Sequence, residues 1–457
     1  MIALTLAEVA AAVDGRLEAA PDVVVTGSVE FDSRAVRPGG LFVALPGERV
    51  DGHHFADAAV RAGAVGVLAA RPLTGVPAVV VPDVQAALGR LARAVVDRLP
   101  GLIVVGLTGS SGKTSTKDLL AHVLAAAGPT VAPPGSFNNE IGHPWTVLRA
   151  DDSTRFLVLE CSARGPGHIA ALCRIAPPRI GVVLNVGTAH VGEFGSPEAI
   201  AASKGELVAA LPADGVAVLN ADDPAVAAMA GRTRARVLTV GHGPGAAVRS
   251  VDERLDGAGR PSYTLICDRG QADVSLPLYG AHHVPNSLAA AAVALELGMP
   301  LDAVVAALAT ARPASRWRME VTARADGVRV INDAYNANPE SMAAALRALA
   351  AMTGGGRSWA VLGEMGELGA HAAAAHSAVA RLAVELGVQR VLAVGPAARL
   401  YAADGVAVQA VADAGEVVVL LRSELRPGDV VLVKASRAVG LERVALALLA
   451  EPAAVTL

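Results

Sequence analysis

Residues 102–116 read LIVVGLTGSSGKTST, a short apolar run that leads into a glycine-rich turn and a lysine. The run predicts a buried strand, and the apolar positions after Lys113 predict a helix over 114–127. Glycine lets backbone N–H groups turn toward phosphate oxygens, and the first turn of a helix adds partial positive charge. The segment therefore predicts a phosphate-binding loop, with Lys113 reaching the β- and γ-phosphates of a nucleotide and the Thr114 hydroxyl completing a magnesium shell.

The spacing of the glycines departs from the strict form of this motif. The strict form requires glycine at position 107, where this chain has leucine, and the glycines stand instead at Gly106, Gly109 and Gly112. A glycine-rich turn without a ligand is the alternative interpretation. The combination of strand, Gly-Lys-Thr and helix favours the phosphate loop, so we expect ATP to bind here.

Polar residues also mark the ends of other predicted strands. Glu160 closes RFLVLE, Asn185 ends RIGVVLN with His190 shortly after it, and Lys434 closes DVVLVK. Because parallel sheets bind ligands beyond the carboxyl ends of their strands, these side chains are candidates for one site. A carboxylate and a neutral imidazole beside a phosphate loop can ligate a divalent cation. The alternatives are a cap or salt-bridge role for Glu160 and a hydrogen-bonded loop role for His190.

Strand and helix signals alternate along the chain, which predicts an α/β fold with mainly parallel sheets. Residues that break helices and strands near Pro100 and Pro313 divide the chain into a small N-terminal α/β domain, a central phosphate-loop domain and a C-terminal Rossmann-like domain. We place these domains at 1–98, 99–312 and 313–457. A length of 457 residues supports about three domains and a large core without a disulfide or metal staple.

The composition argues against several classes of function. A formal net charge of −4 is unlike a nucleic-acid binder or a broad membrane-binding surface. Hydrophobic residues make up 53%, but no apolar run is long enough to span a bilayer, and the N-terminus lacks the basic start of a signal peptide. Three widely spaced cysteines without a Cys-x-x-Cys pair fit a reducing cytosol and no structural zinc. We therefore expect a cytoplasmic protein that does not insert into membranes.

Lysine is scarce in this chain. It occurs only at Lys113, Lys117, Lys204 and Lys434, and arginine supplies the rest of the 39 basic residues. A chain that uses arginine for a generic positive charge keeps lysine where a guanidinium cannot substitute, so these positions are functional candidates. Lys117, in the helix after the phosphate loop, is the exception, and we expect it to be an ordinary exposed charge.

The segment 136–143, SFNNEIGH, predicts an amide-rich loop. The side chains of Asn138 and Asn139 both donate and accept hydrogen bonds, which suits contact with a sugar or an amide substrate. An Asx-type turn is an equally supported alternative.

Eight segments occur in the order in which the Mur ligases of peptidoglycan synthesis carry them, and the chain resembles that family over nearly its whole length. Besides the phosphate loop, they are SFNNEIGHPWT, TAHVGEFGS, ASKGEL, HHVPNSLAA, RWRME, NDAYNANPESM and VLVKASR. The resemblance implies a three-domain Mur ligase architecture, in which an N-terminal domain binds a UDP-sugar, a central domain binds ATP, and a C-terminal domain closes on ATP. GSSGKTSTK, FNNEIG and YNANP are most similar to the member that adds D-alanyl-D-alanine.

That resemblance implies a reaction. ATP phosphorylates the free carboxylate of UDP-MurNAc-tripeptide to give an acyl phosphate, the amine of D-Ala-D-Ala attacks it, and ADP and phosphate leave. A carboxylate is a poor electrophile at neutral pH, so phosphorylation supplies a leaving group, and positioning and charge neutralisation carry the catalysis. The implied cofactors are ATP and Mg²⁺. The net charge already argues against a nucleic-acid partner, and we expect a monomer.

The resemblance also assigns residues to the nucleotide and its metal. The phosphates are held by Gly109, Ser110, Ser111, Gly112, Lys113, Thr114 and Ser115. Magnesium is coordinated by Thr114, Glu160, His190 and Lys204, the last as the carbamate that Mur ligases carry at the matching lysine. Carbon dioxide adds only to a neutral amine, which arginine cannot present. His282 and Asn286 match residues near the adenine, Arg318 matches an arginine on the γ-phosphate, and Asp333 matches a contact from the C-terminal domain.

Two further sets match substrate contacts. The tripeptide carboxylate or the incoming dipeptide is faced by Asn336, Asn338, Lys434, Ser436 and Arg437. The UDP-sugar is contacted by Ser33, Arg34, Asn138 and Asn139. The residues expected to act directly in catalysis are Lys113, His190, Lys204, Arg318 and Lys434.

The sequence departs locally from the family pattern, and other functions stay open at this point. His282 is followed by His283 where the family commonly has asparagine, so the role of that asparagine falls to Asn286. Within the class, the alternatives are the sister ligase that adds the third residue and a folylpolyglutamate-type synthetase. The sister typically carries GTNGKTT and a DNPR-like motif, and neither occurs here. From other classes, the alternatives are a P-loop ATPase acting as a switch and a simple phosphotransferase.

Overall fold

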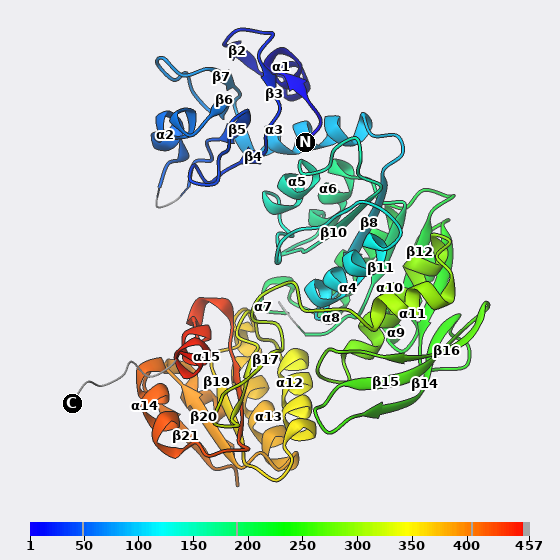
Figure 1. Cartoon of the computed structure of the whole chain (residues 1–457), viewed down its shortest axis with the longest axis vertical. Coiled ribbons are helices and arrows are strands. Elements are labelled where there is room, and N and C mark those ends of the chain that lie inside the picture. The colour runs from blue at the N-terminus through cyan, green and yellow to red at the C-terminus, as the bar shows by residue number, and fades with distance from the viewer. Residues whose placement is uncertain (48–49, 189–190, 404, 451–457) are drawn as a thin grey trace.

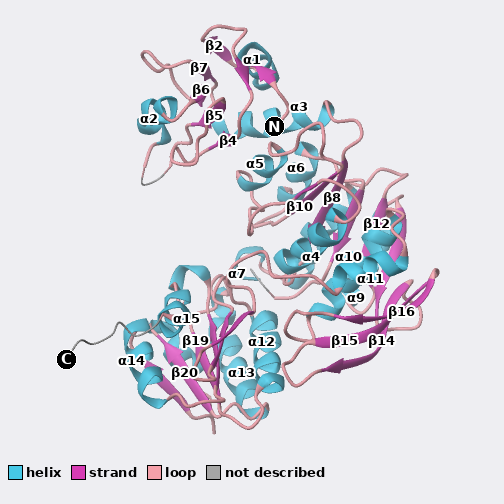
Figure 2. Ribbon diagram, in the orientation of Figure 1, coloured by secondary structure: helices cyan, strands magenta, loops and turns pink. Residues whose placement is uncertain are grey.

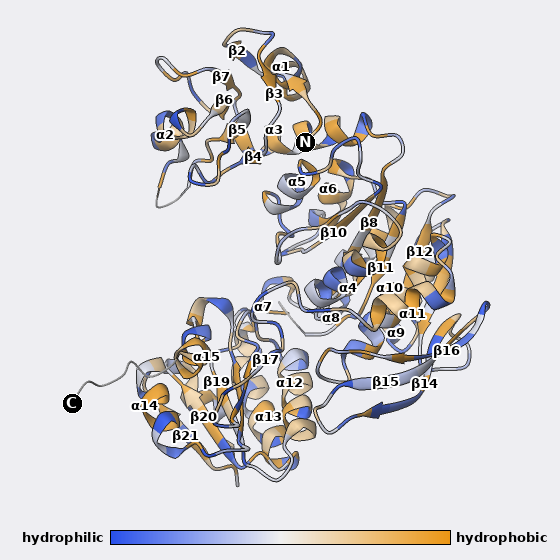
Figure 3. Ribbon diagram, viewed as in Figure 1, coloured by the Kyte–Doolittle hydropathy of each residue, from blue (hydrophilic) through white to orange (hydrophobic). Residues whose placement is uncertain are grey.

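The computed structural model describes residues 1–47, 50–188, 191–403 and 405–450. Three α/β bodies follow one another through the molecule, from blue at the N-terminus to red at the C-terminus (Figure 1). Helices flank the sheets of the central and C-terminal bodies (Figure 2), and β14 is largely hydrophilic, unlike the mostly hydrophobic strands of the C-terminal sheet (Figure 3). Among the described residues, no helix combines the length and apolar composition of a bilayer span. The predicted α/β class is confirmed, whereas the domain limits at 98 and 312 stay predictions.

The N-terminal body is built on a five-stranded sheet of order β2-β7-β6-β5-β4, in which only β2 is antiparallel to its neighbour. Beside it lies the antiparallel pair β1-β3. Its strands are β1 (Leu4–Thr5), β2 (Arg16–Glu18), β3 (Val24–Val25), β4 (Val29–Glu30), β5 (Gly40–Val43), β6 (Ala64–Ala69) and β7 (Ala78–Val80). Its helices are α1 (Leu6–Val13), the 3-10 helix η1 (Gly52–Phe55), α2 (Ala56–Arg61) and α3 (Val84–Asp97).

The central body is built on a nine-stranded sheet of order β16-β15-β14-β13-β12-β11-β8-β10-β9. Its strands are β8 (Ile103–Thr108), β9 (Thr130–Val131), β10 (Phe156–Glu160), β11 (Ile180–Val183), β12 (Val216–Asn220), β13 (Arg236–Gly241), β14 (Val248–Leu255), β15 (Pro261–Cys267) and β16 (Gly270–Ser275). Its helices are α4 (Lys113–Ala125), α5 (Gly142–Val147), α6 (His168–Ile175), α7 (Val191–Phe194), α8 (Pro197–Ala209), α9 (Pro224–Ala227), η2 (Ala228–Arg232), α10 (His283–Glu296) and α11 (Leu301–Leu308).

Strand β8 is where the order of the central sheet changes direction. From it the chain fills one side with β9 and β10, and then returns to fill the other side from β11 onward. The pairings of β8 with β10 and β11, and of β10 with β9, are parallel, so the carboxyl ends of β8, β10 and β11 meet at one edge. Such a switch point leaves a crevice between diverging loops, which is where open parallel sheets bind ligands.

The antiparallel end of the central sheet was not predicted. Strands β14, β15 and β16 pair antiparallel and extend the sheet away from the switch point (Figure 1). In β15 buried and half-buried residues alternate, as expected of a sheet with one face partly solvated. This differs from the continuous apolar runs of the parallel strands, on which the strand predictions depended.

The C-terminal body is a six-stranded sheet of order β17-β18-β22-β19-β20-β21, parallel except for β17. Its strands are β17 (Glu320–Ala323), β18 (Arg329–Asn332), β19 (Ser358–Leu362), β20 (Arg390–Val394), β21 (Val408–Val411) and β22 (Val430–Lys434). Its helices are α12 (Pro339–Met352), η3 (Gly369–His371), α13 (Ala372–Glu385), η4 (Pro396–Tyr401), α14 (Ala414–Glu424), η5 (Arg437–Val439) and α15 (Glu442–Leu449).

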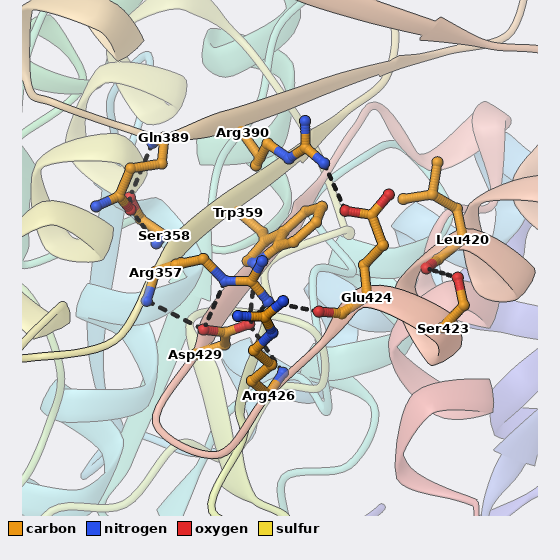
Figure 4. Close-up of polar contacts among 10 residues, drawn as sticks. All are labelled: Arg357, Ser358, Trp359, Gln389, Arg390, Leu420, Ser423, Glu424, Arg426 and Asp429. Atoms are coloured by element: carbon orange, nitrogen blue, oxygen red, sulfur yellow. Dashed lines mark hydrogen bonds and ion pairs between the residues drawn. The ribbon is translucent and has the colours of Figure 1, made fainter.

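A polar cluster around Asp429 lies at the amino ends of the C-terminal strands (Figure 4). The Asp429 carboxylate accepts hydrogen bonds from the guanidinium of Arg357 at 2.7 Å and from the indole N–H of Trp359 at 3.2 Å. Arg390 pairs with Glu424 at 2.5 Å on the far side of that indole. Because ligands of parallel sheets bind at the opposite, carboxyl edge, we interpret this cluster as structural.

Candidate active site

The phosphate loop joins β8 to α4 through residues 109–112. Gly112 is the N-cap of α4 with a φ of 78°, and no side chain caps the helix. The first N–H groups of α4 therefore have no partner within the helix, which is the arrangement that binds anions. A Cβ atom at Gly112 would lie 2.8 Å from Oδ1 of Asn286 in α10, so both the backbone and the packing require glycine.

Replacing Gly112 with alanine tests this loop. The left-handed backbone costs about 1–2 kcal/mol for an L-residue, and the added methyl group displaces Asn286. We expect nucleotide affinity to fall at least about tenfold, which corresponds to about 1.4 kcal/mol, measured by calorimetric titration with ADP. Gly101→Ala is the matched control, since a Cβ atom there meets nothing within 4 Å. Unchanged ADP affinity in Gly112→Ala would contradict the assignment.

The loop is held from two sides. Nζ of Lys113 donates to the carbonyl of Gly109 at 2.7 Å, and burial lowers the pKa of this lysine. The backbone N–H groups of Ser110 and Ser111 each donate to Oδ1 of Asn185 at 2.9 Å. Asn185 follows β11, so the neighbouring strand fixes the curvature of the loop.

Glu160, at the end of β10, lies beside the start of α4. Its carboxylate is 1% exposed and accepts from the hydroxyl of Thr114 at 3.0 Å, the hydroxyl of Ser136 at 2.9 Å and the amide of Asn138 at 2.6 Å. A buried carboxylate next to a hydroxyl is an all-oxygen donor set, which is what Mg²⁺ prefers, so the residues present fit this ion. The third predicted ligand, His190, lies outside the described residues.

Lys204 is buried in α8, with 8% of its surface exposed. Burial, helped by the charge of Lys113, lowers its pKa to about 7. Glu206 accepts from the backbone N–H groups of Gly167 at 2.6 Å and Ala170 at 3.0 Å, which holds α8 against the segment after β10. Because the pKa of Lys204 is lowered to about 7, a substantial fraction of this side chain is a neutral amine near neutral pH.

The C-terminal body completes the site across a cavity of about 600 Å³. The Arg318 guanidinium donates to Oγ1 of Thr114 at 3.2 Å and lies 4.3 Å from the centre of the Tyr335 ring. Predicted residues from both bodies line this cavity: Ser110, Ser111, Gly112, Lys113, Thr114, Ser115, Asn138, Glu160, Arg318, Asn336, Asn338, Ser436 and Arg437. The fold therefore gathers most of the predicted nucleotide and acceptor residues in one place.

Several of these side chains also support the fold around the cavity. Asn338 is the N-cap of α12 and accepts from the N–H of Ser341 at 2.8 Å, while its amide donates to the carbonyl of Ser110 at 3.3 Å. The Ser436 hydroxyl accepts from the N–H of Gly366 at 2.8 Å, and Arg437 pairs with Glu442 at 2.7 Å. Their predicted contact with substrate stays a prediction.

Lys434 and Asp333 form a buried ion pair rather than lining the cavity. Nζ of Lys434 donates to Oδ2 of Asp333 at 2.6 Å and to the carbonyl of Asn336 at 2.8 Å. The other carboxylate oxygen of Asp333 accepts from the N–H of Met319 at 3.0 Å. In this structure the pair therefore anchors the linker before β17, and direct contact of either residue with substrate or nucleotide stays a prediction.

The residues predicted near the adenine meet at the start of α10. The rings of His282 and His283 lie 4.4 Å apart, and burial lowers the pKa of His282 to about 4. Nδ2 of Asn286 is buried and has no hydrogen-bond partner among the described residues. His283, which departs from the family pattern, lines a small recess with Tyr279, Asp118 and Arg318.

The residues predicted to contact the UDP-sugar come from two loops that an aromatic cluster brings together. The ring of Trp145 lies 5.6 Å from Phe31 and 4.7 Å from Phe137, and its N–H donates to the carbonyl of Val29 at 2.9 Å. Phe31 precedes Ser33 and Arg34, and Phe137 precedes Asn138 and Asn139. Arg34 is exposed and pairs with Asp32 at 2.7 Å. Oδ1 of Asn139 accepts from the N–H of Ile141 at 3.3 Å, which closes the Asx turn named as the alternative, and also from the N–H of Gly142 at 2.9 Å.

Sequence reasoning missed part of the cavity lining and misplaced one lysine. Arg164, Tyr335 and Glu367 line the cavity, and only Tyr335 lies within a motif that the sequence singled out. Lys117, expected to be exposed, is 2% exposed. The expectation for Lys117 is wrong because, besides the adjacent Asp118, its partners are the carbonyl of Pro133 and the hydroxyl of Ser315, which no local pattern places beside it.

The fold and this site define a phosphate-loop protein of three α/β bodies, whose third body closes one wall of the nucleotide pocket. Sequence profiles agree: residues 27–96 match the Mur ligase family catalytic domain, 107–294 the Mur ligase middle domain, and 317–437 the Mur ligase glutamate ligase domain. The chain belongs to the Mur ligase family.

Individual relatives show which members of the Mur ligase family the chain is similar to. UDP-N-acetylmuramoyl-tripeptide–D-alanyl-D-alanine ligase of Mycobacterium tuberculosis is 53% identical over 99% of this chain and 98% of its own, and that of Escherichia coli is 36% identical over 98% and 99%. Among solved structures, MurF from Acinetobacter baumannii has a TM-score of 0.89 at 30% identity, covering 98% of this chain and 99% of its own. MurF from Thermotoga maritima, in complex with ADP, has a TM-score of 0.81 at 32% identity, and the match covers 92% of this chain and 96% of its own.

Proposed function

We propose that this chain joins D-alanyl-D-alanine to UDP-N-acetylmuramoyl-tripeptide in an ATP-dependent, ADP-forming reaction of peptidoglycan precursor synthesis. The observation that carries this function is the shared cavity, where a phosphate loop and the C-terminal body face each other. A nucleotide switch needs only the phosphate loop, whereas a ligase also needs a second body that brings an acceptor to the γ-phosphate. The relatives that the chain matches over their whole length carry the same activity in their names.

The residues of the phosphate loop account for nucleotide binding. The first-turn amides of α4 and the ammonium of Lys113 hold the β- and γ-phosphates of ATP. Arg318, reaching in from the linker, neutralises charge on the transferred phosphoryl group as the acyl phosphate forms. Tyr335 and Thr114 orient that guanidinium, because it stacks on the first and donates to the second.

The acidic side of the cavity is the place for Mg²⁺. Thr114 and Glu160, with His190 and a carbamate on Lys204, are the residues that would hold it, and the ion supplies charge neutralisation on the phosphates. Asn138 and Ser136 orient the Glu160 carboxylate through their hydrogen bonds. The buried amine of Lys204 suits carbon dioxide addition, because that reaction requires the neutral form.

The acceptor side is assigned to the C-terminal body. Asn336, Ser436 and Arg437 lie across the cavity from the phosphate loop, where a carboxylate and an amine must meet. Ser33 and Arg34, on the N-terminal body, hold the UDP-sugar end together with the 138–139 loop. Fixing both substrates in this way makes their encounter effectively unimolecular, which lowers the barrier to reaction. We further propose that the protein acts as a cytoplasmic monomer.

A two-substrate assay tests this function. We expect ADP formation only when UDP-MurNAc-tripeptide and D-Ala-D-Ala are both present, measured by a coupled ADP assay and by mass spectrometry of the pentapeptide product. The sister activity would instead appear with UDP-MurNAc-dipeptide and a single amino acid. Equal turnover without either acceptor would overturn the ligase and favour the switch. Running the assay with tripeptides ending in meso-diaminopimelate and in L-lysine identifies the preferred third residue.

A further inference from the structure

The linker between the central and C-terminal bodies is bonded at both ends of one short segment, 315–319. Ser315 and Met319 are buried, whereas Pro313, Ala314 and Arg316 are exposed. Between the two buried ends, Trp317 has a φ of 59°, and Met319 itself has a φ of 47°. Bulky residues rarely adopt this left-handed conformation, so the surrounding bonds must enforce it.

The first end is bonded to helix α4. Oδ2 of Asp118 accepts from the backbone N–H of Ser315 at 2.9 Å, and Oδ1 accepts from its hydroxyl at 3.1 Å. The ammonium of Lys117 pairs with Asp118 and also donates to the Ser315 hydroxyl at 3.2 Å and the carbonyl of Pro133 at 2.8 Å. A 2% exposed lysine is thus fully engaged at this junction.

The second end is bonded to the C-terminal sheet in the same manner. Oδ1 of Asp333 accepts from the backbone N–H of Met319, and the buried ammonium of Lys434 neutralises this carboxylate. Two buried lysine–aspartate pairs therefore each capture one backbone N–H group of the segment. Arg318 is the only arginine between them that reaches the phosphate loop among the described residues.

We propose that Asp118, with Lys117 and Ser315, is a positioning group that sets where Arg318 presents its guanidinium to the nucleotide. Asp118 and Thr114 lie four residues apart on α4, which places them about 6 Å apart along the helix axis. Ser315 and Arg318 lie three residues apart, a length that spans at most about 10 Å. The linker thus runs beside α4 with two matched attachments, Ser315 on Asp118 and Arg318 on Thr114.

This arrangement also locates the pivot of the C-terminal body. The exposed residues around Pro313 lie before the anchored Ser315, so movement there would not carry Arg318 with it. Residues 317–319 are bonded to the C-terminal body through Tyr335 and Asp333, so rotation about the anchored Ser315 would carry Arg318 together with that body. The inference rests on the proposed function only for the role of Arg318 on that phosphate.

The test is a double-mutant cycle read out by nucleotide selectivity. Affinities for ADP and for the non-hydrolysable analogue adenylyl imidodiphosphate are measured by calorimetry, with no acceptor substrate present. Loss of a hydrogen bond to a charged group lowers affinity about tenfold to a hundredfold, so we expect Arg318→Ala to lose that much of the preference for the triphosphate. Asp118→Ala should lose a similar factor alone and nothing further in the Arg318→Ala background.

Two variants and a control keep the result interpretable. Asp118→Asn retains an oxygen for the N–H of Ser315 and should recover most of the selectivity. Asp118→Ala leaves Lys117 buried without its partner, so if it fails to fold, the double variant Lys117→Met/Asp118→Leu removes the junction without stranding a charge. Asp97→Ala breaks an exposed ion pair on α3 and should change nothing.

Two results would overturn the inference: full triphosphate preference after loss of the junction, or an equal loss with and without Arg318. Because the readout uses no acceptor, it is separate from the ligase assay. If the double-mutant cycle shows coupling between Asp118 and Arg318 but ADP formation does not depend on the acceptor, only the ligase function is refuted. Normal ligation with no coupling between Asp118 and Arg318 would refute the positioning role alone.

Discussion

Replacing Lys204 with alanine should lower kcat by about a thousandfold, since it removes the lysine whose proposed carbamate would give the metal an anionic oxygen donor. The residue is buried, and burial lowers its pKa to about 7, so the neutral amine is well populated at neutral pH. Alanine leaves a space that a small carboxylate can enter. We therefore expect added formate or acetate to restore part of the activity in a saturable manner, measured by the two-substrate ADP assay.

The matched control for this experiment is Lys204→Arg. A guanidinium keeps the positive charge but cannot add carbon dioxide, and it fills the space that a small carboxylate needs. This variant should be as inactive as Lys204→Ala and should not respond to carboxylates. Full activity in either variant would refute the carbamate, and rescue of Lys204→Arg would show that the carboxylates act elsewhere.

Replacing Lys113 with methionine should lower kcat/KM for ATP by about a thousandfold, because in the proposed mechanism the ammonium contacts phosphates whose charge grows during transfer. Methionine has a similar length and no charge, so the carbonyl of Gly109 loses its 2.7 Å partner without a large change in volume. Steady-state kinetics at saturating acceptor measures the effect. The melting temperature, followed in parallel, should change little.

Two variants control for charge and shape at Lys113. Lys113→Arg should recover little activity, since a planar guanidinium does not fit where a compact ammonium lies inside the loop. Arg93→Met removes an exposed positive charge from α3 and should leave kcat/KM unchanged. A loss of less than about tenfold in Lys113→Met would contradict the proposed phosphate contact.

The parallel strands were predictable because their apolar runs are continuous. The residues 102–107, 155–160 and 429–434 coincide closely with β8, β10 and β22, each buried on both faces. The hairpins β14–β16 were not predictable by that criterion, because their partly solvated faces break the runs with charged residues such as Asp252 and Arg254. A search for alternation around the turn at Asp256 and Gly259 would have detected them.

The site shows the same division between local and distant information. The sequence indicates the phosphate loop directly, because strand, turn and helix are consecutive. It does not indicate that Asn185 closes the loop from 74 residues away, or that Lys117 meets Ser315 across 198 residues. Such contacts depend on the order of strands in the sheet and on the path of the linker, neither of which local periodicity records.

None of the four lysine side chains is exposed: Lys113 is half-buried, and Lys117, Lys204 and Lys434 are buried. The outer surface, whose positive charges are carried by guanidinium groups, therefore offers acylating reagents no freely accessible side-chain amine. Crosslinkers and labels that react with lysine should modify the folded enzyme slowly. Faster labelling would then report an opened cavity or a released linker, so the scarcity of lysine makes these reagents selective probes of opening in this protein.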